Sequence, residues 1–319
     1  MIQRGTVVVT SRSFGHGTSD PGADLTASGL EVTRGPADHD PGALGPLLGS
    51  AVAWIAGSGP VTEEHLRLAP DLQIVARYGT GVDAVDLDAA RRRRIVVTNT
   101  PEANADAVAE HTVALMLACL RHIVTADRHV RDGEWPAVRG RELGASTVGV
   151  VGFGAVGRRV AGLVEGFGAT VVAHDPFADM TGVEALALDE LLARADVVSL
   201  HRPPGPAPVI DAAALERMPD GAVLVNTARA SLLDEDAVAA ALDGGRLGAV
   251  GADVLRGVDD PDAPAAGDGP SPLLTAPRTV LTPHCAAQTD QAIDRMGAAA
   301  VAEVIRVIVD RTTPLNRVA

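Results

Sequence analysis

The stretch VGVVGFGAVGRRVAGLVEGFGATVVAHD, residues 148–175, decides the fold. An apolar run leads into Gly152, Gly154 and Gly157, which stand in G-x-G-x-x-G spacing, and a helix-like segment follows them. A second apolar run then ends at Asp175. The glycine spacing alone is a weak signal. A strand, a glycine turn, a helix and a second strand in this order are typical of a βαβ unit that binds a dinucleotide.

Each residue of the turn has a physical task in that interpretation. Gly152 permits the tight turn, Gly154 lets the backbone approach a pyrophosphate, and Gly157 lets the helix pack close to the sheet. The amides of Ala155 and Val156, at the start of the helix, face the phosphate charge.

Asp175 sets the expected choice of dinucleotide. Its carboxylate can accept hydrogen bonds from the adenosine ribose hydroxyls, and it would repel a 2′-phosphate. The stretch therefore predicts NAD, as NAD⁺ or NADH, in preference to NADP. The competing interpretation is a glycine-rich turn beside a solvent-exposed aspartate.

Short valine-rich runs alternate with alanine-rich helical patterns along most of the chain. Apolar runs without polar alternation are what a parallel sheet covered on both faces requires. We therefore predict an α/β protein of right-handed βαβ units, with two doubly wound parallel sheets. The predicted strands are 6–10, 52–57, 72–79 and 95–100 in one sheet, and 146–154, 169–175, 196–201, 222–228, 248–255 and 279–284 in the other.

The helical patterns complete this organisation, and a chain of 319 residues suits two domains. Residues 102–122 predict a long helix that joins the two sheets, is buried on several sides and is a candidate subunit contact, and residues 291–310 predict a final amphipathic helix. The Pro/Gly-rich segments 14–46 and 256–272 predict surface loops. The remaining predicted helices are 155–167, 186–194, 211–217 and 234–244.

The formal net charge of −14 opposes a general nucleic-acid or membrane-surface role, because both need a positive field. The one dense basic run, Arg91 to Arg94, follows a helical segment. It is interpreted as a solvated helix end favoured by the helix dipole. The alternative is a patch that recognises an anion or a partner.

The two cysteines, Cys119 and Cys285, make neither a disulfide scaffold nor a metal site, so no metal is expected. Cys119 is expected to be plain core. The sequence opens without a signal-peptide pattern, and no apolar run approaches the roughly 20 residues that span a bilayer. The expectation is a cytoplasmic protein with no nucleic-acid and no membrane partner.

Further motifs occur in the order typical of one family. They are VTNTPEANADAVAEHTVALMLA (97–118), VLVNTARAS (223–231), GADV (251–254) and TPHCAAQT (282–289). Together with the glycine motif, they make residues from about 50 to 310 resemble the D-isomer-specific 2-hydroxyacid dehydrogenases. RYGTGVDAVDLDAA (77–90) resembles the phosphoglycerate dehydrogenase branch in particular, in a chain too short to add that branch's regulatory domains.

The resemblance implies a flavodoxin-like substrate domain formed by residues 1–100 plus 287–319. It implies a Rossmann NAD-binding domain over residues 101–286, with the active site between the two. Members of the family are usually dimers, so a homodimer formed through the NAD-binding domains is expected.

The resemblance also assigns the chemistry. Arg229 should bind the carboxylate and keto oxygen of the substrate, because a forked, permanently charged guanidinium can hold the negative charge that hydride delivery builds on oxygen. His284 should donate or remove the proton, since the pKa of imidazole lies near working pH. Ala230 stands where the family usually has glycine.

Other positions line the expected site. The backbone amides of Gly79, Thr80 and Gly81 should face the substrate carboxylate, with Thr80 also close to the nicotinamide. Arg77 should approach an anionic substrate, or else form a structural ion pair. Candidate cofactor-binding residues after the other strands are Arg202, Thr227, Ala228 and Asp253, of which Asp253 should bind the nicotinamide carboxamide.

The loop GADVLRGVDDP (251–261) departs from the family pattern D-V-F-x-x-E-P, in which the glutamate hydrogen-bonds the catalytic histidine. Ungapped alignment puts Val258 at the glutamate position. An insertion of one or two residues would bring in Asp259 or Asp260, and Asp260 is preferred because it precedes Pro261. The alternative is a solvated acidic loop that leaves His284 unsupported.

A second departure concerns the substrate. Phosphoglycerate-using relatives place a phosphate-binding arginine near the position of Ala56 and Gly57. We therefore expect a different small anionic 2-oxo or 2-hydroxy acid. Two rival functions stay open: an NAD(H)-responsive binding or regulatory protein on the same scaffold, and a phosphite- or formate-type dehydrogenase, although phosphite enzymes use a lysine near the position of Thr80.

Overall fold

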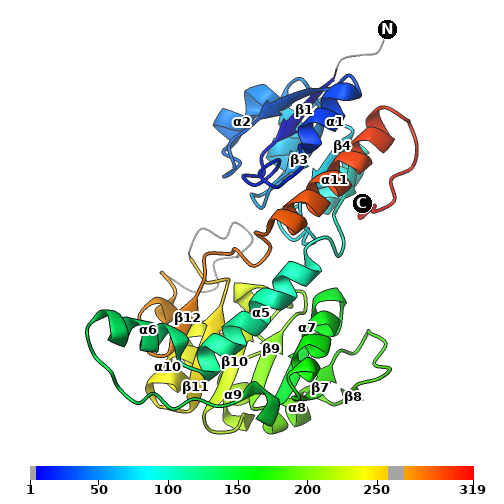
Figure 1. Cartoon of the computed structure of the whole chain (residues 1–319). Coiled ribbons are helices and arrows are strands. Elements are labelled where there is room, and N and C mark those ends of the chain that lie inside the picture. Colours follow the sequence, from blue (N-terminus) through cyan, green and yellow to red (C-terminus); the bar gives the residue numbers. More distant parts are fainter. Residues whose placement is uncertain (1–4, 258–268) are drawn as a thin grey trace. The chain divides into compact units, whose positions relative to one another are not determined.

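The computed structural model describes residues 5–257 and 269–319, which form two compact units (Figure 1). Unit 1 comprises Met1–Asn104 and Ala287–Ala319, and unit 2 comprises Ala105–Ala286. Each unit has its own parallel sheet with helices on both faces. The fold class expected from the valine-rich runs, two doubly wound α/β units, is confirmed.

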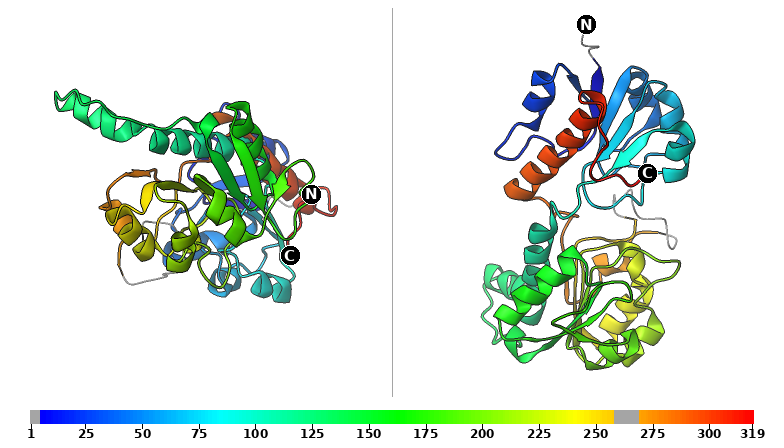
Figure 2. Two further views of the ribbon diagram at one scale, coloured as in Figure 1. Left: turned by 90° about the horizontal axis from the view of Figure 1, so that it is seen from below. Right: turned by 90° about the vertical axis from the view of Figure 1, so that its right-hand side faces the viewer.

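Unit 1 contains a five-stranded sheet in the order β2-β1-β3-β4-β5, which is the flavodoxin-like order. Helices α1 and α11 pack together against one face, and α2, α3 and α4 lie along the other (Figure 2). The strands are β1 (Thr6–Val9), β2 (Glu31–Arg34), β3 (Ala51–Ala56), β4 (Ile74–Arg77) and β5 (Val96–Thr98), and the helices are α1 (Pro21–Ala27), α2 (Pro41–Leu48), α3 (Glu63–Leu68), α4 (Leu87–Arg93) and α11 (Asp290–Ile308).

The prediction of a surface loop over residues 14–46 was wrong. This segment holds α1, the edge strand β2 and α2. Both helices begin with an Asp-Pro pair: Asp20 and Asp40 are the N-caps, accepting hydrogen bonds from Gly22 N and Ala43 N, and proline occupies the first helical position.

Unit 2 contains a seven-stranded sheet in the order β12-β11-β10-β9-β6-β7-β8, a Rossmann order with one strand added beyond it. Its strands are β6 (Thr147–Val151), β7 (Thr170–His174), β8 (Glu184–Ala185), β9 (Val197–Leu200), β10 (Ala222–Asn226), β11 (Leu247–Ala252) and β12 (Thr279–Leu281). The two-residue edge strand β8 was not predicted. Every strand pair in this sheet is parallel, so the carboxyl ends of the strands meet at one edge.

Helices cover both faces of this sheet. Helices α5 (Ala105–Leu120) and α7 (Ala155–Gly166) pack on one face, and α8 (Leu188–Arg194), α9 (Ala212–Arg217) and α10 (Glu235–Asp243) pack on the other. Short 3-10 turns occupy η1 (Leu143–Ala145), η2 (Ala230–Leu232) and η3 (Pro272–Leu274). Cys119, on α5, is buried as expected.

The long helix expected over 102–122 is interrupted. His122 adopts a left-handed conformation (φ 52°), and α6 (Ile123–Arg131) leaves α5 at an angle of 61°. In the described part of the chain, no single helix is long and apolar enough to cross a membrane, and α5 and α6 meet that test only together, as a bent pair.

The basic run is a helix end. Arg91, Arg92 and Arg93 occupy the exposed last turn of α4, and Arg94 caps it in the left-handed conformation. Arg91 pairs with Asp88 and Arg92 with Glu63, on the surface.

Candidate active site

The glycine turn between β6 and α7 has the backbone geometry that its sequence demands. Gly152 has φ 95°, and a Cβ there would lie 2.6 Å from the carbonyl carbon of His201. A Cβ on Gly157 would lie 2.1 Å from the Gly152 oxygen. At Gly154, the N-cap of α7, a Cβ would meet nothing within 4 Å. Two glycines are therefore needed by the protein itself, while the third faces open space.

That open space lies at the N-terminus of α7. Ala155 and Val156 are the first helical residues, and both are half-buried. Their amides have no partner within the helix, because the first turn of any helix leaves such donors unused. A phosphate at this end would gain hydrogen bonds and a favourable helix dipole.

Asp175 directly follows β7 and is fixed by three backbone amides. Its Oδ2 accepts from Phe153 N (2.8 Å), and its Oδ1 accepts from Phe177 N (2.9 Å) and Ala178 N (3.2 Å). Desolvation alone would raise the pKa of this carboxyl, but the amides and nearby His174 outweigh it and hold the pKa below its ordinary value. Asp175 is thus a fixed, half-buried anion. It lies 22 residues after Phe153, the residue of the glycine turn whose amide it binds.

Residues after β9 come to the same turn. His201 donates its amide to Val151 O (2.7 Å), and its Nε2 lies 2.8 Å from Ser199 Oγ. Burial holds the pKa of His201 far below the ordinary value, so its ring is neutral at physiological pH. Arg202 follows with its Nε donating to Pro203 O, and a Cβ on Gly205 would lie 3.4 Å from its Nη2.

The segment after β10 is shaped by Asn226, a buried residue that sequence reasoning did not single out. Its Oδ1 accepts from Ala228 N (3.0 Å), and its Nδ2 donates to Arg229 O (2.8 Å). These bonds turn the chain immediately after the strand. They place Thr227, Ala228 and Arg229 in half-buried positions at the carboxyl edge of the sheet.

Asp253 follows β11 and is 1% exposed. Its Oδ1 accepts from Thr282 Oγ1 (2.5 Å) and Cys285 N (2.9 Å), and its Oδ2 accepts from Ala286 N (2.8 Å). The Cys285 thiol also lies beside this carboxylate. The same bonds tie the segment after β12 to the end of β11.

His284 lies in that segment, in a left-handed conformation (φ 50°) and with an exposed side chain. Its amide donates to Asp253 O (2.9 Å). A non-glycine residue held in this region of backbone space is uncommon and clusters at functional sites. The Asp253 network supplies the bonds that hold it there.

A histidine on α5 completes this network and was missed from the sequence. His111 Nε2 lies 2.9 Å from Thr282 Oγ1 and 3.6 Å from Asp253 Oδ1. The next residue, Thr112, is hydrogen-bonded through its hydroxyl to Thr227 Oγ1 (2.8 Å). Two consecutive residues of α5 thus reach the ends of β10 and β12. The polar residues of EHT (110–112) stand out in an apolar helix, but the sequence does not indicate which strand ends they contact.

The remaining predicted residues belong to unit 1, where Arg77 ends β4 and the others follow it. Gly79 has φ 141°, and Thr80 and Gly81 continue an exposed or half-exposed turn. The turn is held from its own unit, since Thr100 N donates to Gly79 O and Asn99 Nδ2 donates to Thr80 O. Thr80 Oγ1 lies 3.2 Å from Asn104 Oδ1. Arg77, 7% exposed, donates to Tyr78 O.

The positions weighed for an acidic partner of His284 lie outside the described residues: Val258, at the family's glutamate position, and the candidates Asp259 and Asp260. The chain that leads to them is well anchored. Glu235, a buried carboxylate at the start of α10 that was not predicted, accepts from Arg256 N (2.9 Å), and the Arg256 guanidinium pairs with Asp236.

The structure thus brings the predicted residues of unit 2 to the carboxyl edge of one sheet, and those of unit 1 to the carboxyl edge of the other. An NAD-shaped ligand fits the unit 2 edge on three observations: an open glycine where a pyrophosphate would lie, a helix N-terminus beside it, and a fixed carboxylate after β7 that disfavours a 2′-phosphate.

Comparison with known proteins gives the same result. The family model "D-isomer specific 2-hydroxyacid dehydrogenase, NAD binding domain" matches residues 113–286. Among solved structures, the TT0316 protein from Thermus thermophilus is similar at 34% identity with a TM-score of 0.87, covering 98% of this chain and 100% of that one.

Two curated relatives illustrate the range. A D-3-phosphoglycerate dehydrogenase of Mycobacterium tuberculosis (strain H37Rv) is 44% identical over 255 residues, which are 77% of this chain and 47% of the relative. A hydroxypyruvate reductase of Thermotoga maritima is 36% identical over 261 residues, 80% of this chain and 84% of the relative. The chain spans about half the length of the D-3-phosphoglycerate dehydrogenases that it matches.

Proposed function

This chain belongs to the D-isomer specific 2-hydroxyacid dehydrogenase family, and on that premise we propose that it is an NAD-dependent oxidoreductase interconverting a small 2-oxo acid and its D (R) 2-hydroxy acid. The observation that carries the proposal is the carboxyl edge of the unit 2 sheet. There the chain presents a dinucleotide turn together with a guanidinium, Arg229, and an imidazole, His284. The bound nicotinamide would supply or accept the hydride.

The chain's own residues would do the rest. Arg229 binds the carboxylate and steadies charge on the keto oxygen, and His284 gives that oxygen its proton in reduction or removes it in oxidation. Asp253, whose carboxylate is fixed by Thr282, Cys285 N and Ala286 N, orients the nicotinamide carboxamide, beside Thr227 and Ala228.

We propose a substrate-binding role for residues of unit 1 as well. The turn Gly79-Thr80-Gly81 would face an anionic substrate with the amides of Thr80 and Gly81, since the Gly79 amide donates to Arg77 O (3.0 Å), and Arg77 would add a positive charge. We propose the same division for the units themselves: unit 1 is the substrate domain and unit 2 the NAD-binding domain. Arg202 is assigned to the cofactor phosphates, for which its position after β9 suits it.

We propose Asp260 as the acidic partner of His284. A carboxylate at hydrogen-bond distance raises the pKa of an imidazole, commonly by about 1–3 units, and it also fixes the tautomer of the ring. Val258 offers neither effect, and Asp259 lacks the acid-proline pair.

The proposed substrate carries no phosphate. Ala56 is buried at the end of β3, and a Cβ on Gly57 would lie 2.9 Å from the Thr10 oxygen. The backbone at 57 therefore has no room for the arginine that a phosphate would call for. The hydroxypyruvate reductase among the relatives acts on an acid of the proposed size, by its name.

We further propose a homodimer formed by unit 2 of each copy. Helix α6 has no buried residue, and it carries exposed Ile123, Val124 and Val130, continued by Trp135 and Val138. Figure 2 shows this segment extending outward from its own sheet. Burying these side chains against a second copy would remove a large apolar surface from water.

A cytoplasmic location is proposed as well. Both cysteines are free thiols, which accords with a reducing compartment. Recovery of the native protein from a secreted or periplasmic fraction would contradict this.

The test is NADH consumption with a panel of 2-oxo acids, including hydroxypyruvate, glyoxylate and pyruvate, and 3-phosphohydroxypyruvate as the phosphorylated member. We expect turnover of an unphosphorylated acid, a loss of about 10²–10⁴-fold in kcat for His284→Gln, and a higher KM with lower kcat for Arg229→Lys. Both variants should still bind NADH. Arg92→Lys, on the exposed end of α4, is the matched control and should match the unaltered protein.

The other outcomes are equally informative. Tight NADH binding without turnover would establish the binding or regulatory function instead, and faster NAD reduction by phosphite or formate would establish that substrate class. Asp260→Asn should lower the pKa that governs kcat/KM, and if both this variant and Asp259→Asn leave the pH profile unchanged, His284 has no acidic partner in this loop.

A further inference from the structure

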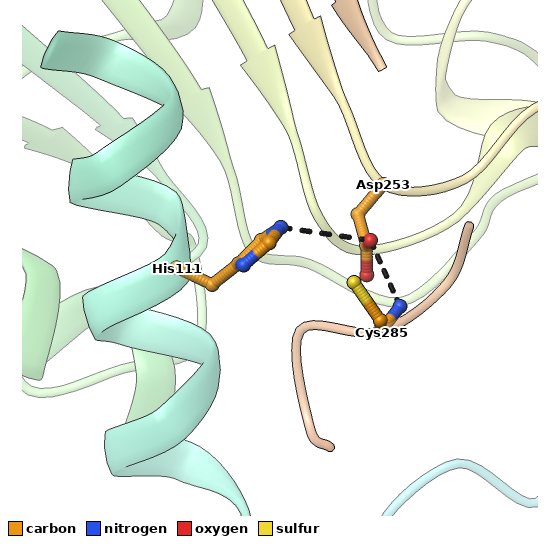
Figure 3. A group of neighbouring side chains, drawn as sticks. All are labelled: His111, Asp253 and Cys285. Atoms are coloured by element: carbon orange, nitrogen blue, oxygen red, sulfur yellow. Dashed lines mark hydrogen bonds and ion pairs between the residues drawn. The ribbon is translucent and has the colours of Figure 1, made fainter. Parts of the chain in front are cut away.

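Three donor groups of different chemistry converge beside His284. His111 Nε2 comes from α5, an oxygen of Asp253 follows β11, and Cys285 Sγ follows β12 (Figure 3). One ligand atom from each lies within 4.8 Å of the others. The three positions are up to 174 residues apart in sequence (285 − 111), so only the fold brings them together.

The spacing of His111 and Asp253 suits a shared ion better than a direct hydrogen bond. His111 Nε2 and Asp253 Oδ1 are separated by 3.6 Å, which is too long for one. Nitrogen and oxygen ligands on one tetrahedral zinc ion lie about 3.4 Å apart, from bond lengths of about 2.0–2.2 Å. A small closure of the Cys285 side chain would complete three corners of a tetrahedron.

The site is also pre-built in its charge and orientation. Asp253 is 1% exposed, and the bonds to Thr282, Cys285 N and Ala286 N fix the direction of its carboxylate. His111 and Cys285 are each partly exposed, so an ion can reach the group. Thr282 Oγ1 is bonded to both Asp253 and His111 Nε2, so an ion on Nε2 would displace the His111–Thr282 hydrogen bond and leave the Thr282–Asp253 bond to fix the carboxylate.

We propose that His111, Asp253 and Cys285 form a binding site for a borderline-soft divalent cation such as Zn²⁺, with a fourth position open to water. A set of one imidazole, one carboxylate and one thiolate favours Zn²⁺ over Mg²⁺ or Ca²⁺, which prefer oxygen ligands alone. Binding moves the His111 proton from Nε2 to Nδ1 and releases the Cys285 thiol proton to solvent. One proton therefore leaves for each ion that binds.

The ion would occupy the place proposed for the nicotinamide carboxamide, because both need Asp253. Zn²⁺ should therefore compete with NADH and inhibit reversibly. This consequence rests on the proposed function, whereas the cation site does not.

The experiment uses the full chain and two direct readouts. Co²⁺ serves as the spectroscopic probe, because a cobalt–thiolate bond gives a charge-transfer band in the near ultraviolet. Calorimetry in buffers of different ionisation enthalpy measures the Zn²⁺ affinity and the protons released. Cys285→Ser should abolish the band and weaken Zn²⁺ at least about tenfold, and His111→Gln, which keeps a donor for Thr282, should weaken it similarly.

Cys119→Ala is the matched control, since Cys119 is buried and burial raises its pKa to about 12. It should leave both the band and the affinity unchanged. The proposal is overturned if Zn²⁺ binds Cys285→Ser and His111→Gln as tightly as the unaltered protein, or if the band disappears in Cys119→Ala. If Zn²⁺ binds as proposed but NADH does not displace it, the cation site stands and the placement of the nicotinamide at Asp253 fails.

Discussion

His39, in unit 1, lies at the centre of a buried hydrogen-bond network with no spare donor or acceptor. Its Nδ1 can only donate to the carbonyl of Pro60 (3.0 Å), so its Nε2 accepts from Thr10 Oγ1 (2.6 Å). The Thr10 oxygen in turn accepts from Trp54 Nε1 and Gly57 N. The bonds therefore fix the neutral form and a single tautomer of the imidazole.

This network should make stability depend on pH. Burial lowers the pKa of His39 to about 4, against an opposing effect of the Pro60 carbonyl, and nearby His65 and Arg77 lower it further. Below pH 6.5 the unfolded chain takes up a proton that the folded chain refuses, so the contribution is complete above 6.5 and is lost as the pH falls towards 4. Between pH about 7.5 and about 5 the loss should be on the order of 2 kcal/mol.

Urea unfolding at these two pH values measures it. In His39→Gln the difference between the two free energies of unfolding should shrink by about that amount, whatever the variant does to stability at neutral pH. His16→Gln, at an exposed position of unit 1, is the control and should preserve the pH dependence. An equal slope in His39→Gln would mean that His39 is not the group responsible.

At the scale of the element, α7 offers two glycines with opposite surroundings. A Cβ on Gly157 would lie 2.1 Å from the Gly152 oxygen, whereas one on Gly162 would meet nothing within 4 Å. Gly157→Ala should therefore lower the free energy of unfolding by about 1–3 kcal/mol and weaken NADH binding, because the helix must move off the turn. Gly162→Ala should raise the free energy by about 0.5–1 kcal/mol, since glycine is costly inside a helix.

Thermal or urea unfolding and NADH fluorescence titration of both variants decide the matter. Comparable stability and NADH affinity in the two variants would show that the close approach of α7 to the turn is not required.

The β6–α7 unit was predictable because its constraints are local. The positive φ of Gly152 and the close approach of Gly157 to the Gly152 oxygen are set within the motif itself, whereas the atoms that a Cβ on Gly152 would meet belong to His201 and Arg202. The prediction of a loop over residues 14–46 was wrong because it relied on composition and not on local constraints. The glycines and prolines of this segment suggested a loop, although the Asp20-Pro21 and Asp40-Pro41 pairs begin helices. The strand β2 contains only one strongly apolar residue, Val32, so its sequence gives little sign of a strand.

For the candidate site, the sequence predicted only those residues that directly follow a predicted strand. Arg229, Asp253 and His284 each follow an apolar run, so their common edge could be inferred from parallel pairing. His111 could not be joined to them, since a helix on one face of the sheet meets the strand ends through packing alone. Asn226, whose hydrogen bonds turn the chain towards Arg229, lies in a recognised motif but was given no role of its own.

At the scale of the whole molecule, the largest question is assembly. The sequence placed the candidate subunit contact on residues 102–122, but α5 is largely covered by its own unit, through α7 and the sheet. The exposed apolar surface continues instead along α6 and beyond it, where Val130 is 50% and Trp135 is 88% exposed. The break at His122 is what carries these side chains away from the core.

Light scattering after size exclusion tests the dimer directly. We expect the unaltered chain to show twice its mass of 32.6 kDa, and the double variant Val130→Asp, Trp135→Asp to show the single mass, because each carboxylate would be desolvated in the interface. Both side chains are exposed within the chain, so the variant should keep its circular dichroism. Leu315→Asp, at an apolar residue of unit 1 that is 72% exposed, is the control and should remain a dimer. A monomeric unaltered chain, or a dimer that survives the double variant, would place the interface elsewhere or remove it.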